Sequence, residues 1–112
     1  MGFFDTFFGG GGDRISAQEV KAEMESGQNV ILLDVREPSE FSQGHIPGAR
    51  LASLQSLQSY SQQKLPDRDA RIIVYCQSGS RSNSAVRLLK SLGYTNVVSL
   101  GGIMSWPYGI ER

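Results

Sequence analysis

Short apolar runs separated by polar segments organise this chain of 112 residues. Two of the runs, at residues 30–33 and 72–75, are continuously apolar. They are too short for helices and lack the alternation of a half-exposed strand, so they predict strands buried on both faces of a sheet. Residues 97–100 and 49–52 predict further short strands.

Helical patterns lie between these strands. Ser16 and Glu19 form a capping box, which predicts a helix that runs to about residue 26 and ends at Gly27. Weaker patterns predict a turn or two of helix at residues 38–44 and a surface helix at 53–63. A core-facing helix ending at Gly93 is predicted by apolar residues with helical spacing, namely Ala85, Leu88, Leu89 and Leu92.

Strands that alternate with helices predict an α/β fold with a parallel sheet covered on both faces. In such sheets ligands bind beyond the carboxyl ends of the strands. Asp34 and Cys76 each end a predicted buried strand, so both are expected at that edge. The length of the chain suits one domain, expected over residues 13–112.

Composition excludes several classes of function. Eleven Lys and Arg residues balance eleven Asp and Glu residues, so nucleic acid is not expected as a partner. A single cysteine excludes an internal disulfide and a multi-cysteine zinc site, and a single histidine removes most other zinc arrangements, so neither a metal nor a cofactor is expected. No apolar run approaches the roughly 20 residues that cross a bilayer. A cytoplasmic location is predicted.

Residues 1–12, MGFFDTFFGGGG, differ from the rest of the chain. Asp5 interrupts the apolar stretch, and a signal peptide would need a basic start and a longer apolar core. One interpretation is a flexible tail with an aromatic end. The other is a weak peripheral anchor to a membrane or partner, because the two Phe pairs would share one face of a helix.

The strongest chemical signal is the segment that follows the second buried strand. Cys76 opens a small polar loop, and Arg81 stands at the start of the next helix. Loop amides, the positive end of the helix dipole and the arginine all favour an anion at the centre of the loop. The thiol pKa of Cys76 should therefore be lowered. The residues expected to surround the sulfur and bind the substrate are Gln77, Ser78, Gly79, Ser80 and Arg81.

A second interpretation of Cys76 stays open at this point: a free cysteine after an apolar strand is often a small buried hydrophobe. Asp34 and Arg36 are expected either to support the loop or to form a structural ion pair. His45 is interpreted as a structural turn residue, and Trp106 as a core residue.

Three blocks of the sequence, in order, resemble the signatures of single-domain rhodaneses, which are sulfurtransferases. They are LLDVREPSEFSQGHIPGA (32–49), IIVYCQSGSRS (72–82) and LGGIMSW (100–106). The resemblance covers residues 14–108. It implies a five-stranded parallel sheet with helices on both faces, whose very short first strand lies near Arg14 and Ile15.

The resemblance also implies a mechanism. Cys76 would take a sulfur atom from a donor such as thiosulfate, form a persulfide, and pass the sulfur to cyanide or a thiol. The loop amides and Arg81 would hold the anion. Because the chain has one cysteine, the acceptor must be external. Some thiosulfate-using relatives carry two or more basic loop residues, whereas Arg81 is the only charged residue of this loop.

Two alternatives are weighed against the sulfurtransferase. Cysteine-dependent phosphatases and arsenate reductases also close a Cys loop with Arg, but the phosphatases have five intervening residues where this chain has four. A non-catalytic rhodanese-like binding module is the other alternative, disfavoured by the presence of Cys76. The fold alone does not separate these functions.

Overall fold

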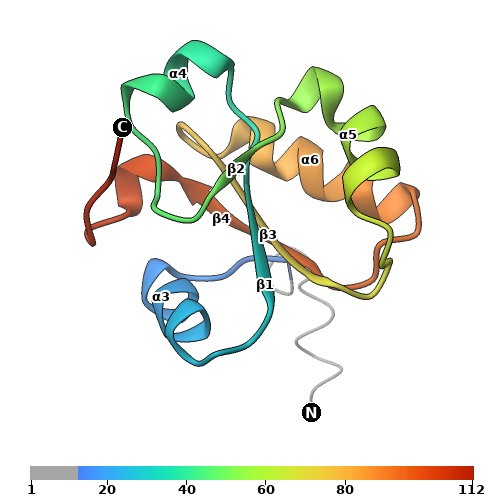
Figure 1. Cartoon of the computed structure of the whole chain (residues 1–112), viewed down its shortest axis with the longest axis horizontal. Coiled ribbons are helices and arrows are strands. Elements are labelled where there is room, and N and C mark those ends of the chain that lie inside the picture. The colour runs from blue at the N-terminus through green and yellow to red at the C-terminus, as the bar shows by residue number, and fades with distance from the viewer. Residues whose placement is uncertain (1–12) are drawn as a thin grey trace.

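The computed structural model describes residues 13–112 (Figure 1). Both interpretations of residues 1–12, a flexible tail and a peripheral anchor, lie outside the described residues. The strands are β1 (Val30–Asp34), β2 (Arg50–Leu51), β3 (Arg71–Cys76) and β4 (Val97–Gly102). The helices are α3 (Ala17–Glu25), α4 (Pro38–Gln43), α5 (Leu57–Lys64) and α6 (Ser80–Ser91), with 3-10 turns η1 (Leu54–Ser56) and η2 (Ile103–Ser105).

The four strands form one parallel sheet in the order β2-β1-β3-β4. Asp34 pairs with Tyr75, and Cys76 pairs with Gly102. The carboxyl ends of the three longer strands therefore meet at one edge. This register places Asp34 and the Cys76 loop at the same edge, as the apolar runs predicted.

The expected number of strands was wrong. The described residues hold four strands, and the expected first strand near Arg14 is reduced to a single parallel bridge between Arg14 and Ser99. Ile15 donates its N–H to the Ser99 carbonyl at 3.0 Å, but the next residue, Ser16, is already the N-cap of α3. Too few residues remain before the helix for a strand to extend.

Two apolar cores cover the two faces of the sheet. In one, Ile72, Val74 and Cys76 of β3 pack with buried residues of α5 and α6. In the other, Ile73 and Tyr75 pack with buried residues of α3, its preceding loop and the C-terminal segment, namely Val20, Ile15 and Trp106. Figure 1 shows α3 on the side of the sheet opposite α5 and α6. β3 is thus buried on both faces, as its uninterrupted apolar sequence predicted.

The predicted helices form with small shifts at their ends. The capping box of α3 is present, with Glu19 N–H donating to Ser16 Oγ at 3.1 Å. The helix expected at 53–63 is divided into η1 and α5. Across residues 13–112, the helices are all too short or too polar to span a membrane. The cytoplasmic location stays a prediction.

Candidate active site

The Cys76 loop is a tight turn between the end of β3 and the start of α6. Gly79 turns the chain with φ +119°, a left-handed conformation that favours glycine, and serves as the N-cap of α6. The turn brings two backbone amides onto the sulfur. Gly79 N–H donates to Cys76 Sγ at 3.0 Å, and Ser82 N–H donates to it at 3.3 Å.

These amides decide the protonation of the thiol. Cys76 is 1% exposed, and burial by itself raises the pKa of a thiol. The hydrogen bonds donated by Ser82 and Gly79, with a smaller one from Ser78 N–H, outweigh that effect and hold the pKa below its usual value. A thiolate formed in this way is nucleophilic without a general base.

Two buried hydroxyls, of Ser99 in β4 and Ser82 in α6, connect the loop to β4. Ser99 Oγ donates to Ser82 Oγ at 2.9 Å and accepts from Gly101 N–H at 3.0 Å. Ser82 Oγ in turn contacts the Gly79 carbonyl oxygen at 2.9 Å. Ser82 and Ser99 are almost completely buried, with 0% and 1% exposure. The loop conformation is therefore fixed by β4 as well as by α6.

Arg81 forms an ion pair that sequence reasoning missed. Its Nη1 and Nη2 donate to Glu40 Oε1 and Oε2 at 2.7 and 3.0 Å. This pairing lowers the pKa of Glu40 to about 2, against an opposing effect of burial. The charge expected to face an anion in the loop is thus shared with a carboxylate of α4.

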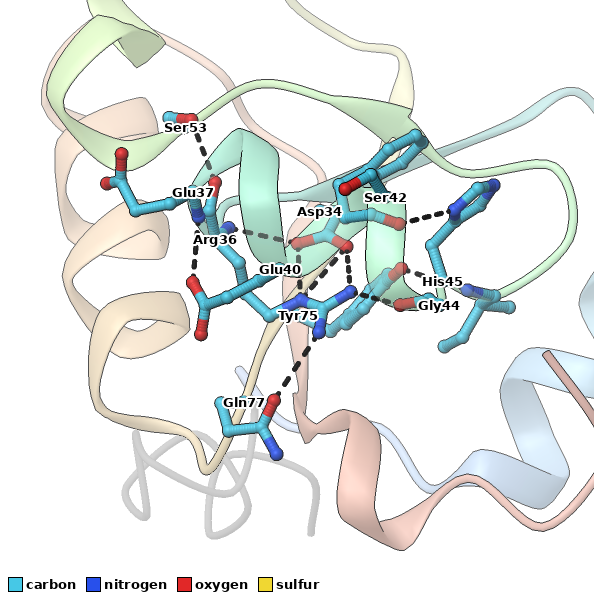
Figure 2. Close-up of polar contacts among 12 residues, drawn as sticks. Asp34, Arg36, Glu37, Glu40, Ser42, Gly44, His45, Ser53, Tyr75 and Gln77 are labelled. Carbon is cyan, nitrogen blue, oxygen red and sulfur yellow. Dashed lines mark hydrogen bonds and ion pairs between the residues drawn. The ribbon is translucent and has the colours of Figure 1, made fainter. Parts of the chain in front are cut away.

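Asp34 and Arg36 form a buried ion pair beside the loop (Figure 2). Arg36 Nη2 donates to Asp34 Oδ2 at 2.6 Å and to the Gly44 carbonyl at 2.7 Å, while Nε donates to Asp34 Oδ1 at 2.9 Å. Arg36 Nη1 reaches Gln77 Oε1 at 3.4 Å. The pair therefore contacts the loop through Gln77, and it is also a structural ion pair at the end of β1.

Tyr75 and His45 lie on the other side of this pair (Figure 2). Tyr75 Oη accepts a hydrogen bond from Ile46 N–H at 3.1 Å, and burial raises the pKa of the phenol. His45 stacks on the Phe41 ring with 3.7 Å between centroids, and its Nδ1 lies 2.9 Å from the Phe41 carbonyl oxygen. Both side chains are engaged in holding the segment after α4.

A cleft of about 560 Å³ opens beside the loop. It reaches the loop at Gln77, and Arg36 and Glu40 also line it. Gln43 and Gly44 line it at the end of α4, and the C-terminal segment contributes a mainly apolar wall of Ile103, Trp106, Pro107 and Ile110. Ser78 and Ser80, which were expected to bind substrate, are exposed at the rim of the loop.

Other parts of the site were outside the reach of sequence reasoning. Glu40, Ser82 and Ser99 contact the loop or its residues, and the order of residues carries no sign of these contacts except that Ser82 lies within the loop signature.

Over residues 13–112, the side chains of His, Cys, Asp and Glu form no group of three or more placed to hold a metal ion.

Known proteins resemble the chain in sequence and in structure. The Rhodanese-like domain family matches residues 16–107. The probable adenylyltransferase/sulfurtransferase MoeZ of Mycobacterium tuberculosis is 36% identical over 97 residues, which are 85% of this chain. The chain spans only about a quarter of that relative, 24% of its length.

Smaller relatives match over most of their length. The thiosulfate sulfurtransferase GlpE of Ectopseudomonas mendocina is 36% identical over 94 residues, covering 83% of each chain. The crystal structure of the Alr3790 protein from Anabaena superposes with a TM-score of 0.81 at 31% identity, covering 87% of this chain and 90% of the other. The chain therefore belongs to the rhodanese-like domain family.

Proposed function

We propose that this protein transfers a sulfane sulfur from a donor such as thiosulfate to a nucleophilic acceptor, through a persulfide on Cys76. The observation that carries the proposal is the pair of amides, Gly79 N–H and Ser82 N–H, aimed at Cys76 Sγ. Similarity to GlpE and other named sulfurtransferases supports sulfur transfer in general.

The first half-reaction is a displacement at sulfur. The Cys76 thiolate attacks the outer sulfur of thiosulfate, a new S–S bond forms, and the donor S–S bond breaks. Sulfite leaves with the electron pair of the broken bond, so no oxidant is needed. The loop amides that hold the thiolate also hold the negative charge of the persulfide, because the anion stays within their reach.

The second half-reaction discharges the persulfide. Cyanide or a thiolate attacks the terminal sulfur, and the Cys76 thiolate leaves, which restores the starting enzyme in a ping-pong cycle. The sequence contains one cysteine, so no second thiol of the same chain can form a disulfide with it. The acceptor is therefore a separate molecule.

Intact-mass measurement tests this cycle. Thiosulfate should add one sulfur atom to the protein, and cyanide should then remove it. Cys76→Ala should show neither change while keeping the circular dichroism spectrum of the natural chain. A natural chain that binds no sulfur would favour the non-catalytic module, and Cys76-dependent phosphate release from an aryl phosphate faster than sulfur transfer would favour the phosphatase.

A further inference from the structure

Two arginines on the cleft side of the Cys76 loop are matched by carboxylates. Arg36, only 4% exposed, is paired with Asp34. Arg81 is paired with Glu40 through two hydrogen bonds, at 2.7 and 3.0 Å. Between Cys76 and Arg81 the loop carries no charged residue. Positive and negative charges therefore balance among these residues of the loop and cleft, whereas Arg14 lies against Gly101 and does not line the cleft.

Glu40 is held in place by a second contact. Its Oε1 also accepts the Glu37 N–H at 2.8 Å, as the N3 partner in the capping box of α4. The carboxylate is therefore fixed toward Arg81 by its own helix before any substrate binds. The negative charge of Glu40 is therefore held beside Arg81 at the entrance of the loop.

The cleft beside the loop offers apolar surface to a ligand. Ile103, Trp106, Pro107 and Ile110 form one wall, and Ile110 keeps 50% of its surface exposed. The charged lining residues, Arg36 and Glu40, have opposite signs. Next to the cleft-lining Gln43, Arg112 donates to the Gln43 carbonyl and Glu111 lies 3.7 Å from His45 Nε2, so these last two residues also carry one charge of each sign.

We propose that Glu40 and this apolar wall make the site selective for a singly charged sulfane donor with an apolar organic group, in preference to the doubly charged thiosulfate. The inference rests on the proposed sulfur transfer and names the class of donor. Glu40 acts through Arg81 and is a positioning residue, whereas the cleft wall contacts the organic group.

Organic thiosulfonates are the probes for this class. They share the sulfonyl-sulfane group of thiosulfate but carry one charge less. The Cys76 thiolate attacks the sulfane sulfur, the donor S–S bond breaks, and an organic sulfinate leaves with the electron pair. Methanethiosulfonate and benzenethiosulfonate differ only in the organic group, which separates the effect of charge from that of apolar contact.

The first experiment measures kcat/KM for the three donors with cyanide as the common acceptor. In a ping-pong cycle this quantity reports the donor half-reaction alone. The natural chain should use benzenethiosulfonate at least about tenfold better than thiosulfate, the scale expected for buried aryl surface. A natural chain that prefers thiosulfate over both thiosulfonates would overturn the proposal.

The second experiment replaces Glu40 with Gln, which keeps an N3 acceptor for the Glu37 amide. Freeing the Arg81 charge should raise kcat/KM about fivefold for thiosulfate and about twofold for methanethiosulfonate, because the attraction scales with donor charge. The gain should shrink as salt is added. The matched control is Glu25→Gln on α3, which removes a carboxylate of an exposed pair with Lys21 and has no contact to Arg81, and should change these values little.

The third experiment tests the cleft wall. Ile110→Ala should lower kcat/KM for benzenethiosulfonate about threefold and lower it less for methanethiosulfonate, because an aryl group offers more apolar surface to that wall than a methyl group. Met104→Ala is the control, since Met104 is 75% exposed and does not line the cleft. Equal losses for both thiosulfonates would contradict the contact.

The outcomes separate this inference from the proposed function. If none of the three donors loads sulfur onto Cys76, sulfur transfer itself is refuted. If the donors do load sulfur but Glu40→Gln changes all three equally and without salt dependence, Glu40 is a structural residue and the selectivity proposal is wrong. Sulfur transfer then stands without it.

Discussion

Gly102 and Gln77 approach so closely that a side chain on the glycine has no room. A Cβ atom on Gly102 would lie 2.4 Å from the Gln77 carbonyl oxygen and 2.8 Å from Ser78 Cα. Gly102 has φ −110°, which any residue adopts, so proximity and not backbone freedom requires glycine here. The end of β4 therefore packs directly against the backbone of the Cys76 loop.

Gly102→Ala should displace this loop. Loss of the amide hydrogen bonds to Cys76 Sγ should raise the thiol pKa toward its usual value and slow persulfide formation about tenfold or more, the scale of one lost hydrogen bond to a charged group. Thiolate ultraviolet absorbance against pH and the rate of sulfur loading measure the two effects. An unchanged Cys76 pKa would mean that packing of the loop against Gly102 does not hold the amides in place.

The control for that variant is Gly27→Ala. Gly27 has φ +88°, and a Cβ atom added there would have no neighbour within 4 Å, so alanine is strained but meets no other group. It should cost about 1 kcal/mol of unfolding free energy and leave the thiol pKa unchanged. The pair of variants separates displacement of the loop from general loss of stability.

Asp34→Asn should be strongly destabilising. Asp34 is 0% exposed and its partner Arg36 is 4% exposed, so the substitution leaves a buried positive charge without its carboxylate. The expected loss is about 3–5 kcal/mol of unfolding free energy, measured by urea denaturation. Glu23→Gln, which breaks the partly exposed pair with Arg71, should cost about 1 kcal/mol or less. Equal losses from the two variants would show that burial of the pair is not the cause.

The sequence predicted the central strands because their signal is local. Five consecutive buried positions in β3 require five apolar or small side chains, and residues 72–76 supply them. The strand expected near Arg14 does not extend for an equally local reason: Ser16, the N-cap of α3, comes right after Ile15. Residues 54–64 form η1 followed by α5 and pack into the same core as α6, and the periodicity of this segment indicated only one continuous helix.

The site likewise contains residues that the sequence indicates and residues that it does not. Cys76, Gly79 and Ser82 are close in sequence, so the Cys loop was visible as one segment. The partner of Arg81 was not, because Glu40 is 41 positions away and its spacing from Glu37 indicates only a helix cap. Charge balance at a site depends on such distant pairs, which is why Arg81 looks like an unpaired cation in the sequence alone.

Ser99→Ala should weaken the support of the loop from β4. Alanine leaves Gly101 N–H without its acceptor and removes the donor to Ser82 Oγ. An unpaired buried amide costs about 1–3 kcal/mol, so the urea midpoint should fall accordingly. Ser91→Ala is the control, because that exposed hydroxyl contacts only the Leu88 carbonyl of its own helix and its loss should stay within about 0.5 kcal/mol. A Ser99→Ala variant as stable as the control would refute the bracing role.

The pH dependence of sulfur loading should report the Cys76 thiolate. The loop amides hold the pKa of Cys76 below its usual value despite burial, so the rate of persulfide formation with thiosulfate should rise with pH and level off below about 8.5, the usual thiol value. The free energy of unfolding should also depend on pH through the Cys76 thiol. Because the folded pKa is the lower one, the stabilisation is fully present above the unfolded pKa and is lost as pH falls through the folded pKa.

Rapid-mixing kinetics with excess thiosulfate and urea midpoints across pH measure these two effects. Cys76→Ala is the reference for stability, since subtracting its free energy of unfolding removes the contribution of the other titrating groups that the two chains share. The difference should grow with pH between the folded pKa and about 8.5. A loading rate that keeps rising above that pH, with a flat difference in stability, would mean that the amides of Gly79 and Ser82 do not favour the thiolate.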